Sequence, residues 1–270
     1  MHTGFNFETK KKFDCYFKSG EDLYLRTKKN IEEHLDAYIG ENGEIDGSQL
    51  QEDWFPEIDA DIFLSHSHKD KNLAIRFAGW LYEKFGLVTF IDSCVWGYSN
   101  TLLKNIDNKY CWNKKTQTYN YNTRNFSTSH VHMMLSTSLM KMINKSECII
   151  FLNTSNSTTS TTTKDILTDK AIQKTYSPWI YSEITGIDLI KKNPLEPKAR
   201  NEKFIKKEFS SVTEGKKYEN LTLTYNIDSE LTKLYKLTDS LLDQWQEKST
   251  HLNNKNTDAL DDLYLLTIYK

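Results

Sequence analysis

A short apolar run that stops abruptly in a polar cluster constrains the fold of this chain most. Ile62, Phe63 and Leu64 are followed at once by a Ser/His/Lys-rich stretch that ends at Asp70, after which apolar residues recur with helical spacing. This order is typical of a buried parallel strand, a polar loop and a covering helix. Because ligands of open α/β sheets bind where strands end, the polar cluster predicts a functional site.

The alternation of strand and helix continues along the central part of the chain. Strands are predicted at 61–65, 87–91 and 148–152, and helices at 70–85 and about 129–144. Parallel strands need a crossover connection, which is usually a helix. The pattern therefore predicts an α/β fold with a doubly wound parallel sheet.

The segments outside this alternation are predicted to be extensions or insertions. Residues 1–57 are expected to form a mostly helical N-terminal extension, and residues 248–270 a helical C-terminal one. Residues 58–247 form the main domain, with insertions at about 98–128 and 153–175. The second insertion begins with a Ser/Thr tract that has no apolar residue to bury, so a mobile loop is expected there.

The region after Pro197 carries three weaker signals. We expect a strand at 221–225 and a final helix after Thr257. Between them, a helix opened by Asp228 or Ser229 is expected to carry Leu231, Leu234, Leu237, Leu241 and Leu242.

A second informative motif lies in the segment from Ser177 to Glu183. Trp179 and Glu183 are four residues apart, so they share one face of a predicted helix. An aromatic ring can stack on a ligand, and a neighbouring carboxylate can stabilise positive charge in it. The spacing alone favours a core tryptophan beside a solvated glutamate.

Four motifs in this order resemble those of the TIR (Toll/interleukin-1 receptor) domain family. They are Asp61-x-Phe-x-Ser65, Phe90-x-Asp92 followed by Gly97, the apolar run at 149–152, and Ser177-x-Trp179-x-x-x-Glu183. The likeness covers about residues 58–192 and continues more weakly to about 247. It implies a flavodoxin-like sheet in which a loop follows Asp92. His66-Ser-His68 departs from the Phe-Arg-Gly of many plant members.

The resemblance implies cleavage of NAD⁺ at the nicotinamide–ribose bond, with Glu183 as the catalytic residue. Nicotinamide is already a cationic leaving group, so the enzyme must mainly stabilise an oxocarbenium-like ribose, for which one carboxylate is the minimal tool. The implied substrate-binding residues are Trp179, Ser65, His66, Asp92 and Trp96. NAD⁺ is the substrate in this interpretation, and neither a further cofactor nor a metal is expected.

Members of this family also suggest a biological setting. The resemblance implies a bacterial antiphage (Thoeris-like) defence enzyme that depletes NAD⁺ or makes an ADP-ribose-derived or cyclic signal. Self-association through TIR contacts is expected, with the Asp92–Gly97 loop near the contact. A downstream effector could respond to the nucleotide product.

Two other functions stay open on the sequence alone. The first is a non-catalytic TIR adaptor, although an adaptor has no need of a carboxylate at Glu183. The second is an enzyme like the nucleoside deoxyribosyltransferases, which cleave an N-glycosidic bond with a carboxylate on a related sheet. Turnover of NAD⁺ or of deoxynucleosides separates these possibilities.

Composition and missing motifs exclude several other classes. The net charge of −2 gives no basic field for nucleic acid, and no stretch approaches the roughly 20 uncharged residues of a membrane helix. The four cysteines lack metal or disulfide spacing, which favours a cytoplasmic protein. The pairs His66/His68 and His130/His132 lack a third ligand at typical spacing.

Overall fold

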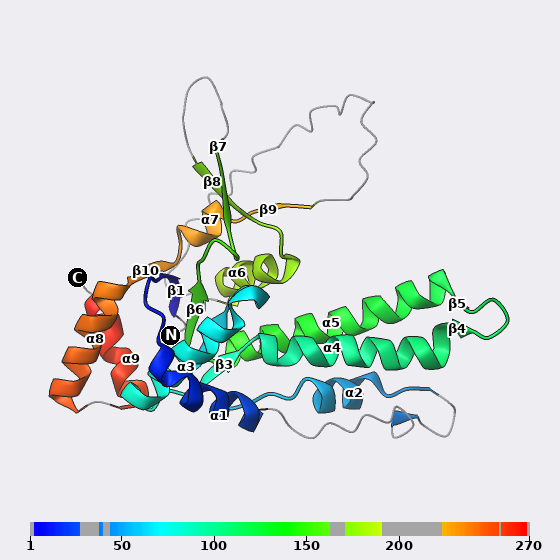
Figure 1. The fold of residues 1–270 in the computed structure, drawn as a ribbon, viewed down its shortest axis with the longest axis horizontal. Helices are drawn as coiled ribbons and strands as arrows, with labels where there is room; N and C mark the ends of the chain where they lie inside the picture. The colour runs from blue at the N-terminus through cyan, green and yellow to red at the C-terminus, as the bar shows by residue number, and fades with distance from the viewer. Residues whose placement is uncertain are drawn as a thin grey trace, which may run out of the picture.

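A five-stranded parallel sheet forms the centre of the computed structural model (Figure 1), which describes residues 3–27, 38–39, 44–162, 171–190, 223–253 and 255–268. Its strands stand in the order β10-β1-β6-β2-β3, and each neighbouring pair is parallel. They are β1 (Thr3–Glu8), β2 (Ile62–Ser65), β3 (Thr89–Ile91), β6 (Cys148–Leu152) and β10 (Tyr235–Thr238). The predictions at 61–65, 87–91 and 148–152 are thus confirmed.

Helices cover both faces of the sheet, as a parallel sheet requires. One face, which carries Ile62 and Leu64, packs against α3 (Lys71–Phe85), α8 (Asp239–Leu252) and α9 (Thr257–Thr267). The other face, which carries Phe63, packs against α2 (Gly47–Trp54), α4 (Ser93–Ile106), α5 (Tyr121–Lys145), α6 (Pro178–Ile190) and α7 (Asp228–Leu231). This α/β architecture is compatible with a flavodoxin-like fold and confirms the predicted helices 70–85 and 129–144.

The N-terminal segment is not a separate helical extension, so that part of the prediction was wrong. Strand β1 lies inside the sheet, between β6 and β10. Phe5 and Phe7 are fully buried on the α3 face, while on the opposite side a Cβ at Gly4 would crowd Ile187 and Leu234. Two phenylalanines among polar residues are a weak local signal, because this strand depends on partners far along the chain.

The helical part of the N-terminal segment is α1 (Phe17–Thr27), which follows a 3₁₀ turn at Asp14–Tyr16. It packs against α3 at a close glycine contact, where a Cβ on either Gly20 or Gly79 would overlap backbone atoms across the contact. Residues 28–37 of the predicted helical extension lie outside the described residues. Helix α2 is capped by Asp46, whose carboxylate accepts from the Ser48 and Gln49 amides.

The C-terminal region also belongs to the sheet. The helix expected from Asp228 is instead interrupted: α7 ends at Leu231, β10 follows, and α8 begins at Asp239. Leu237 stands beside Phe7 in the parallel ladder, so long-range pairing overrides the helical leucine spacing. The final helix after Thr257 is confirmed as α9, but its apolar face is part of the core rather than of an extension.

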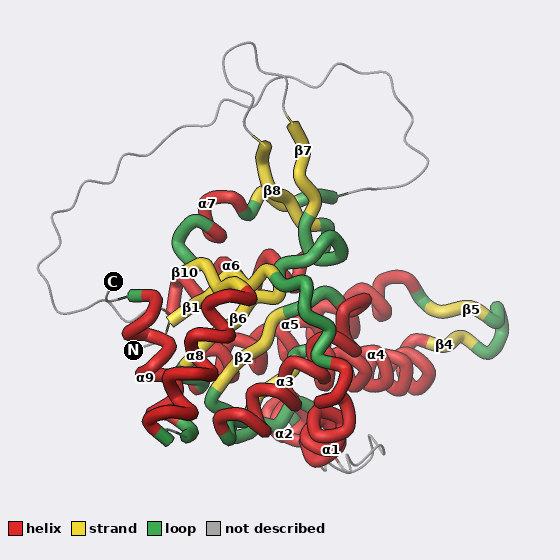
Figure 2. The backbone as a smooth tube through the Cα atoms, turned by 60° about the vertical axis from the view of Figure 1, so that its left-hand side comes forward, coloured by secondary structure: helices red, strands yellow, loops and turns green. Residues whose placement is uncertain are grey.

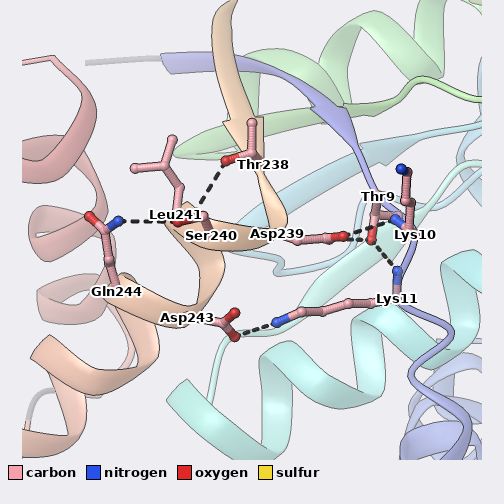
Figure 3. A network of polar contacts seen from close by, with 9 residues as sticks. All are labelled: Thr9, Lys10, Lys11, Thr238, Asp239, Ser240, Leu241, Asp243 and Gln244. Atoms are coloured by element: carbon pink, nitrogen blue, oxygen red, sulfur yellow. Dashed lines mark hydrogen bonds and ion pairs between the residues drawn. The ribbon is translucent and has the colours of Figure 1, made fainter.

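Polar contacts join the two ends of the chain at the carboxyl end of β1 (Figure 3). The Asp239 carboxylate accepts hydrogen bonds from the Thr9 hydroxyl at 2.5 Å and the Lys10 amide at 3.0 Å. Lys11 forms an ion pair with Asp243 on α8. The predicted N-terminal extension is therefore held against the start of α8, which lies in the predicted main domain.

The chain order of the strands identifies a topological switch point. From β2 the chain moves outward to β3, and from β3 it returns across β2 to β6. The order β3-β2-β6 matches the first three positions of a flavodoxin-like sheet, and β1 fills the fourth. The carboxyl ends of β2 and β6 therefore border the crevice in which doubly wound sheets bind ligands.

The expected insertion at 98–128 forms most of a projecting arm (Figure 1). Helix α4 continues into a π-helical turn, η4 (Asp107–Cys111), then a hairpin of β4 (Trp112–Asn113) and β5 (Thr118–Tyr119), and α5 returns. The prediction of a loop after Asp92 was wrong, because α4 starts at Ser93. Although α5 has 25 residues, neither it nor any other helix in the described part is apolar enough to cross a membrane.

A second, antiparallel sheet lies beyond α6 and extends away from the central sheet (Figure 2). It consists of β7 (Thr159–Thr162), β8 (Ala171–Thr175) and β9 (Tyr225–Asn226). The Ser/Thr tract expected to be a loop thus forms a strand in part, and residues 163–170 fall outside the described residues. Of the strand predicted at 221–225, only Tyr225 is in a strand, while 221–222 are not described.

Candidate functional site

Three buried acidic and hydroxyl side chains converge where the parallel strands end. Ser65 is the last residue of β2, Asp92 directly follows β3, and Glu183 lies on α6. All three are at most 1% exposed. Helix α6 is positioned by its first turn, where the Ser177 hydroxyl accepts from the Ile180 amide at 3.3 Å and Pro178 occupies the first helical position.

Glu183 is the most unusual of these groups. Its Oε2 accepts a 2.6 Å hydrogen bond from the Ser65 hydroxyl, whereas its Oε1 is buried without a partner among the described residues. Burial, followed by the nearby negative charge of Asp92, raises the pKa of Glu183 well above its usual range, and the Ser65 hydrogen bond only partly opposes this. Burial and the charge of Asp92 therefore favour the protonated form of Glu183.

His66 and Asp92 form a buried pair beside Glu183. The His66 Nδ1 lies 2.5 Å from Asp92 Oδ1, and both side chains are at most 2% exposed. Burial alone would lower the pKa of His66, but the charge and hydrogen bonding of Asp92 outweigh it, so this pKa is raised. Ser65, Glu183, Asp92 and His66 thus form a continuous row of groups that can exchange or hold protons.

A cavity of about 270 Å³ opens beside this row. It is lined by His66, Ser67, His68, Lys69, Asp92, Ser93, Ser177 and Ile180. Glu183 is not a lining residue, so Asp92 is the carboxylate at the cavity wall and Glu183 lies behind it. The cavity offers hydroxyls, imidazoles and one ammonium group to a polar ligand of modest size.

A hydrogen-bonded support next to the cavity was not predicted from the sequence. Asp70, at the start of α3, accepts from the Thr154 hydroxyl at 2.5 Å and from the Asn156 amide at 2.7 Å. These contacts attach the loop after β6 to the loop after β2. Short polar residues directly after a buried strand are the signal that could have indicated them.

Neither of the two tryptophans predicted to bind substrate is among the residues that line the cavity. Trp179 is half-buried against the apolar cluster under α5 and α6, with its ring edge-on to His132 at 5.6 Å. Trp96 is part of α4, and its side chain lies outside the described part of the structure. The structure therefore brings together Ser65, His66, Asp92 and Glu183.

Within the described residues, no group of three or more His, Cys, Asp or Glu side chains is arranged to hold a metal ion. His66 is buried at the end of β2 and His130 is exposed on α5, so the two H-x-H pairs lie on different elements. The chain matches no protein-family model, no curated protein and no solved structure.

Proposed function

We propose that this protein cleaves the nicotinamide–ribose bond of NAD⁺, in the manner of an enzymatic TIR domain. The single observation that supports this most is the buried Glu183–Asp92 pair at the topological switch point, beside a cavity. Two neighbouring carboxyl groups are a common arrangement at sites that handle glycosidic bonds. An adaptor gains nothing from such a costly buried pair.

The reaction can be written with these groups. The C1′–N bond breaks, its electron pair passes to nicotinamide, and the ribose becomes oxocarbenium-like. Asp92 at the cavity wall supplies negative charge, which its contact with His66 positions. Water then bonds to C1′ and its proton passes to the Asp92–His66 pair, giving ADP-ribose; an internal nucleophile in place of water gives a cyclic product.

Glu183 serves in this proposal as the second, adjustable charge. A cation near a carboxyl group lowers its pKa, so the pyridinium–ribose of bound NAD⁺ favours loss of the Glu183 proton. The charge of the site thus increases when the cationic substrate is present. Release of an ADP-ribose-derived signal, or depletion of NAD⁺ in antiphage defence, is the setting we propose.

The test is incubation of the purified full chain with NAD⁺ and, separately, with mixed deoxynucleosides and free bases, with mass spectrometry of the products. We expect nicotinamide and an ADP-ribose-derived product from NAD⁺, and loss of both with Glu183→Gln. Base exchange among deoxynucleosides without NAD⁺ cleavage would instead assign a deoxyribosyltransferase. An inactive wild type in both assays, including at tens of micromolar protein, would favour the adaptor.

A further inference from the structure

The tip of the α4–α5 arm is a second surface with a distinct chemistry. Figure 1 shows that α4 and α5 project side by side beyond the sheet and that the β4–β5 hairpin closes their far end. Every residue from Trp112 to Phe126 is exposed. We call this stretch, together with Lys109 and Tyr110, the arm tip.

The charged residues within the arm tip are of one sign. Residues 108–126 contain four of the chain's 35 Lys and Arg and none of its 37 Asp and Glu, so the rest of the chain has 31 cations and 37 anions. Asp107, which adjoins the arm tip in the chain, is buried and pairs with Arg124 at 2.9 Å, and Glu44 lines a cavity beside the arm tip. Although the overall charge is −2, the arm tip is basic and the rest of the chain is acidic.

Aromatic rings are interleaved with these cations. Tyr121 is 76% exposed and Phe126 is 67% exposed, while Tyr110, Trp112 and Tyr119 are exposed in part. The Lys109 ammonium lies over the Tyr110 ring, and the Arg124 guanidinium lies over the Tyr119 ring. A cavity of about 580 Å³ at the same surface is lined in part by Tyr110, Phe126 and His130.

Local hydrogen bonds hold this surface in one shape. The Trp112 and Tyr119 rings meet edge to face at 4.9 Å, and the Tyr119 hydroxyl donates to Asn108 at 2.5 Å. Asn113 accepts from the Lys115 amide at 2.9 Å within the hairpin turn, and Asn120 caps α5. A preformed surface of this kind loses little conformational entropy when it binds a ligand.

We propose that the arm tip binds single-stranded nucleic acid. Lys114, Lys115 and Lys109 match the phosphate backbone, and exposed rings such as Tyr121 and Phe126 offer faces on which unpaired bases stack. A membrane-binding surface also combines basic and aromatic side chains, but its apolar face is continuous, whereas amide and hydroxyl residues separate the aromatic ones here. This inference goes beyond NAD⁺ cleavage and does not depend on it.

The test uses the full-length protein and fluorescein-labelled oligo(dT) and oligo(U) of about 20 nucleotides, a length that spans several stacked bases. Fluorescence anisotropy is measured at several salt concentrations. We expect Lys114→Gln/Lys115→Gln to weaken binding about fivefold or more and to reduce the salt slope by about 1 to 1.5. The matched control is Lys141→Gln/Lys145→Gln, which removes two cations that pair with Glu57 and Asp59 at the other end of α5.

A second pair of variants tests stacking. Tyr121→Ala should weaken binding about 5- to 100-fold, by loss of one base–aromatic contact. Tyr82→Ala, which removes a 40% exposed ring from α3, outside the arm tip, should leave binding unchanged. The proposal is overturned by absence of binding at low salt, by equal losses in the two lysine pairs, or by an unchanged affinity of Tyr121→Ala. It is also overturned if anionic lipid vesicles or duplex DNA of the same length bind more tightly than the single strands.

Discussion

Two buried carboxylates in this protein have very different surroundings. Asp107, in the arm, accepts from the Ser127 hydroxyl at 2.6 Å, pairs with Arg124 at 2.9 Å and contacts the Cys111 thiol at 3.5 Å. Glu183, at the carboxyl edge of the sheet, has one hydrogen-bond donor, Ser65, and a raised pKa. Both side chains are at most 3% exposed.

The comparison separates a structural carboxylate from a candidate functional one. The cation and the hydroxyl donor that contact Asp107 offset most of the cost of burying its charge, so a structural role accounts for this residue. The charged form of a buried carboxyl group is destabilised by a second carboxylate beside it. Such an arrangement is typical of functional sites, where activity compensates for the loss of stability. We therefore expect substitutions of the two residues to have opposite consequences for activity and stability.

The largest expected effect is on activity. Glu183→Gln should lower NAD⁺ turnover on the order of 10²–10³-fold, because an amide cannot supply the charge that Glu183 develops in this proposal when the cationic substrate binds. Steady-state assays of nicotinamide release measure it. Asp107→Asn is the matched control, because it replaces a buried carboxyl group in the arm, away from the cavity, and it should retain the wild-type kcat. Equal turnover in wild type and Glu183→Gln would remove Glu183 from the mechanism.

The next effect is on folding stability. Asp107→Asn should reduce the free energy of unfolding by about 1–3 kcal/mol, because it weakens the acceptor for Arg124 and Ser127. Glu183→Gln should preserve stability or increase it, since it removes a group whose ionisation is penalised by burial. Urea unfolding at neutral pH checks both. If Glu183→Gln proves the more destabilising of the two, the contrast between the sites is wrong.

A smaller effect is expected from removal of the Ser65 hydroxyl, which donates a hydrogen bond to Glu183. Ser65→Ala should cost about 1 kcal/mol of stability, the usual contribution of one hydrogen bond, and should lower activity as well. Ser138→Ala is a suitable control, because Ser138 is a buried serine whose hydroxyl has no hydrogen-bond partner within the described residues. Thermal melts of the two variants should differ, with Ser138→Ala close to wild type.

The subtlest effect is a pH dependence. Because folding raises the pKa of Glu183, the folded protein binds more protons than the unfolded chain at pH values above about 4.5, the ordinary value for this group. The stability that this proton contributes is complete below pH 4.5 and is lost as pH rises through the folded pKa. The stability of Glu183→Gln relative to wild type should therefore increase with pH. Melting curves from pH 4.5 upward would show a constant difference if the burial argument were wrong.

The sequence by itself determined the elements whose signals are local. The apolar runs of β2, β3 and β6 and the helical periodicity of α3 predicted their structures, because burial on both faces of a sheet demands such patterns. The same local signals placed Ser65, Asp92 and Glu183 at element ends and on a helix. They could not predict β1 or β10, because these strands contain few apolar residues and form only by pairing with strands that are distant in the sequence.

Only the tertiary structure decided how the site residues meet. Ser65 and Glu183 are 118 residues apart in the chain, yet they share a hydrogen bond because two crossovers bring their elements to one edge of the sheet. The sequence suggested a charged Glu183 that faces the ligand, whereas the fold buries it behind Asp92, and burial is what sets its proton affinity. Residue types follow from the sequence, but desolvation and charge proximity depend on the packed arrangement of distant segments.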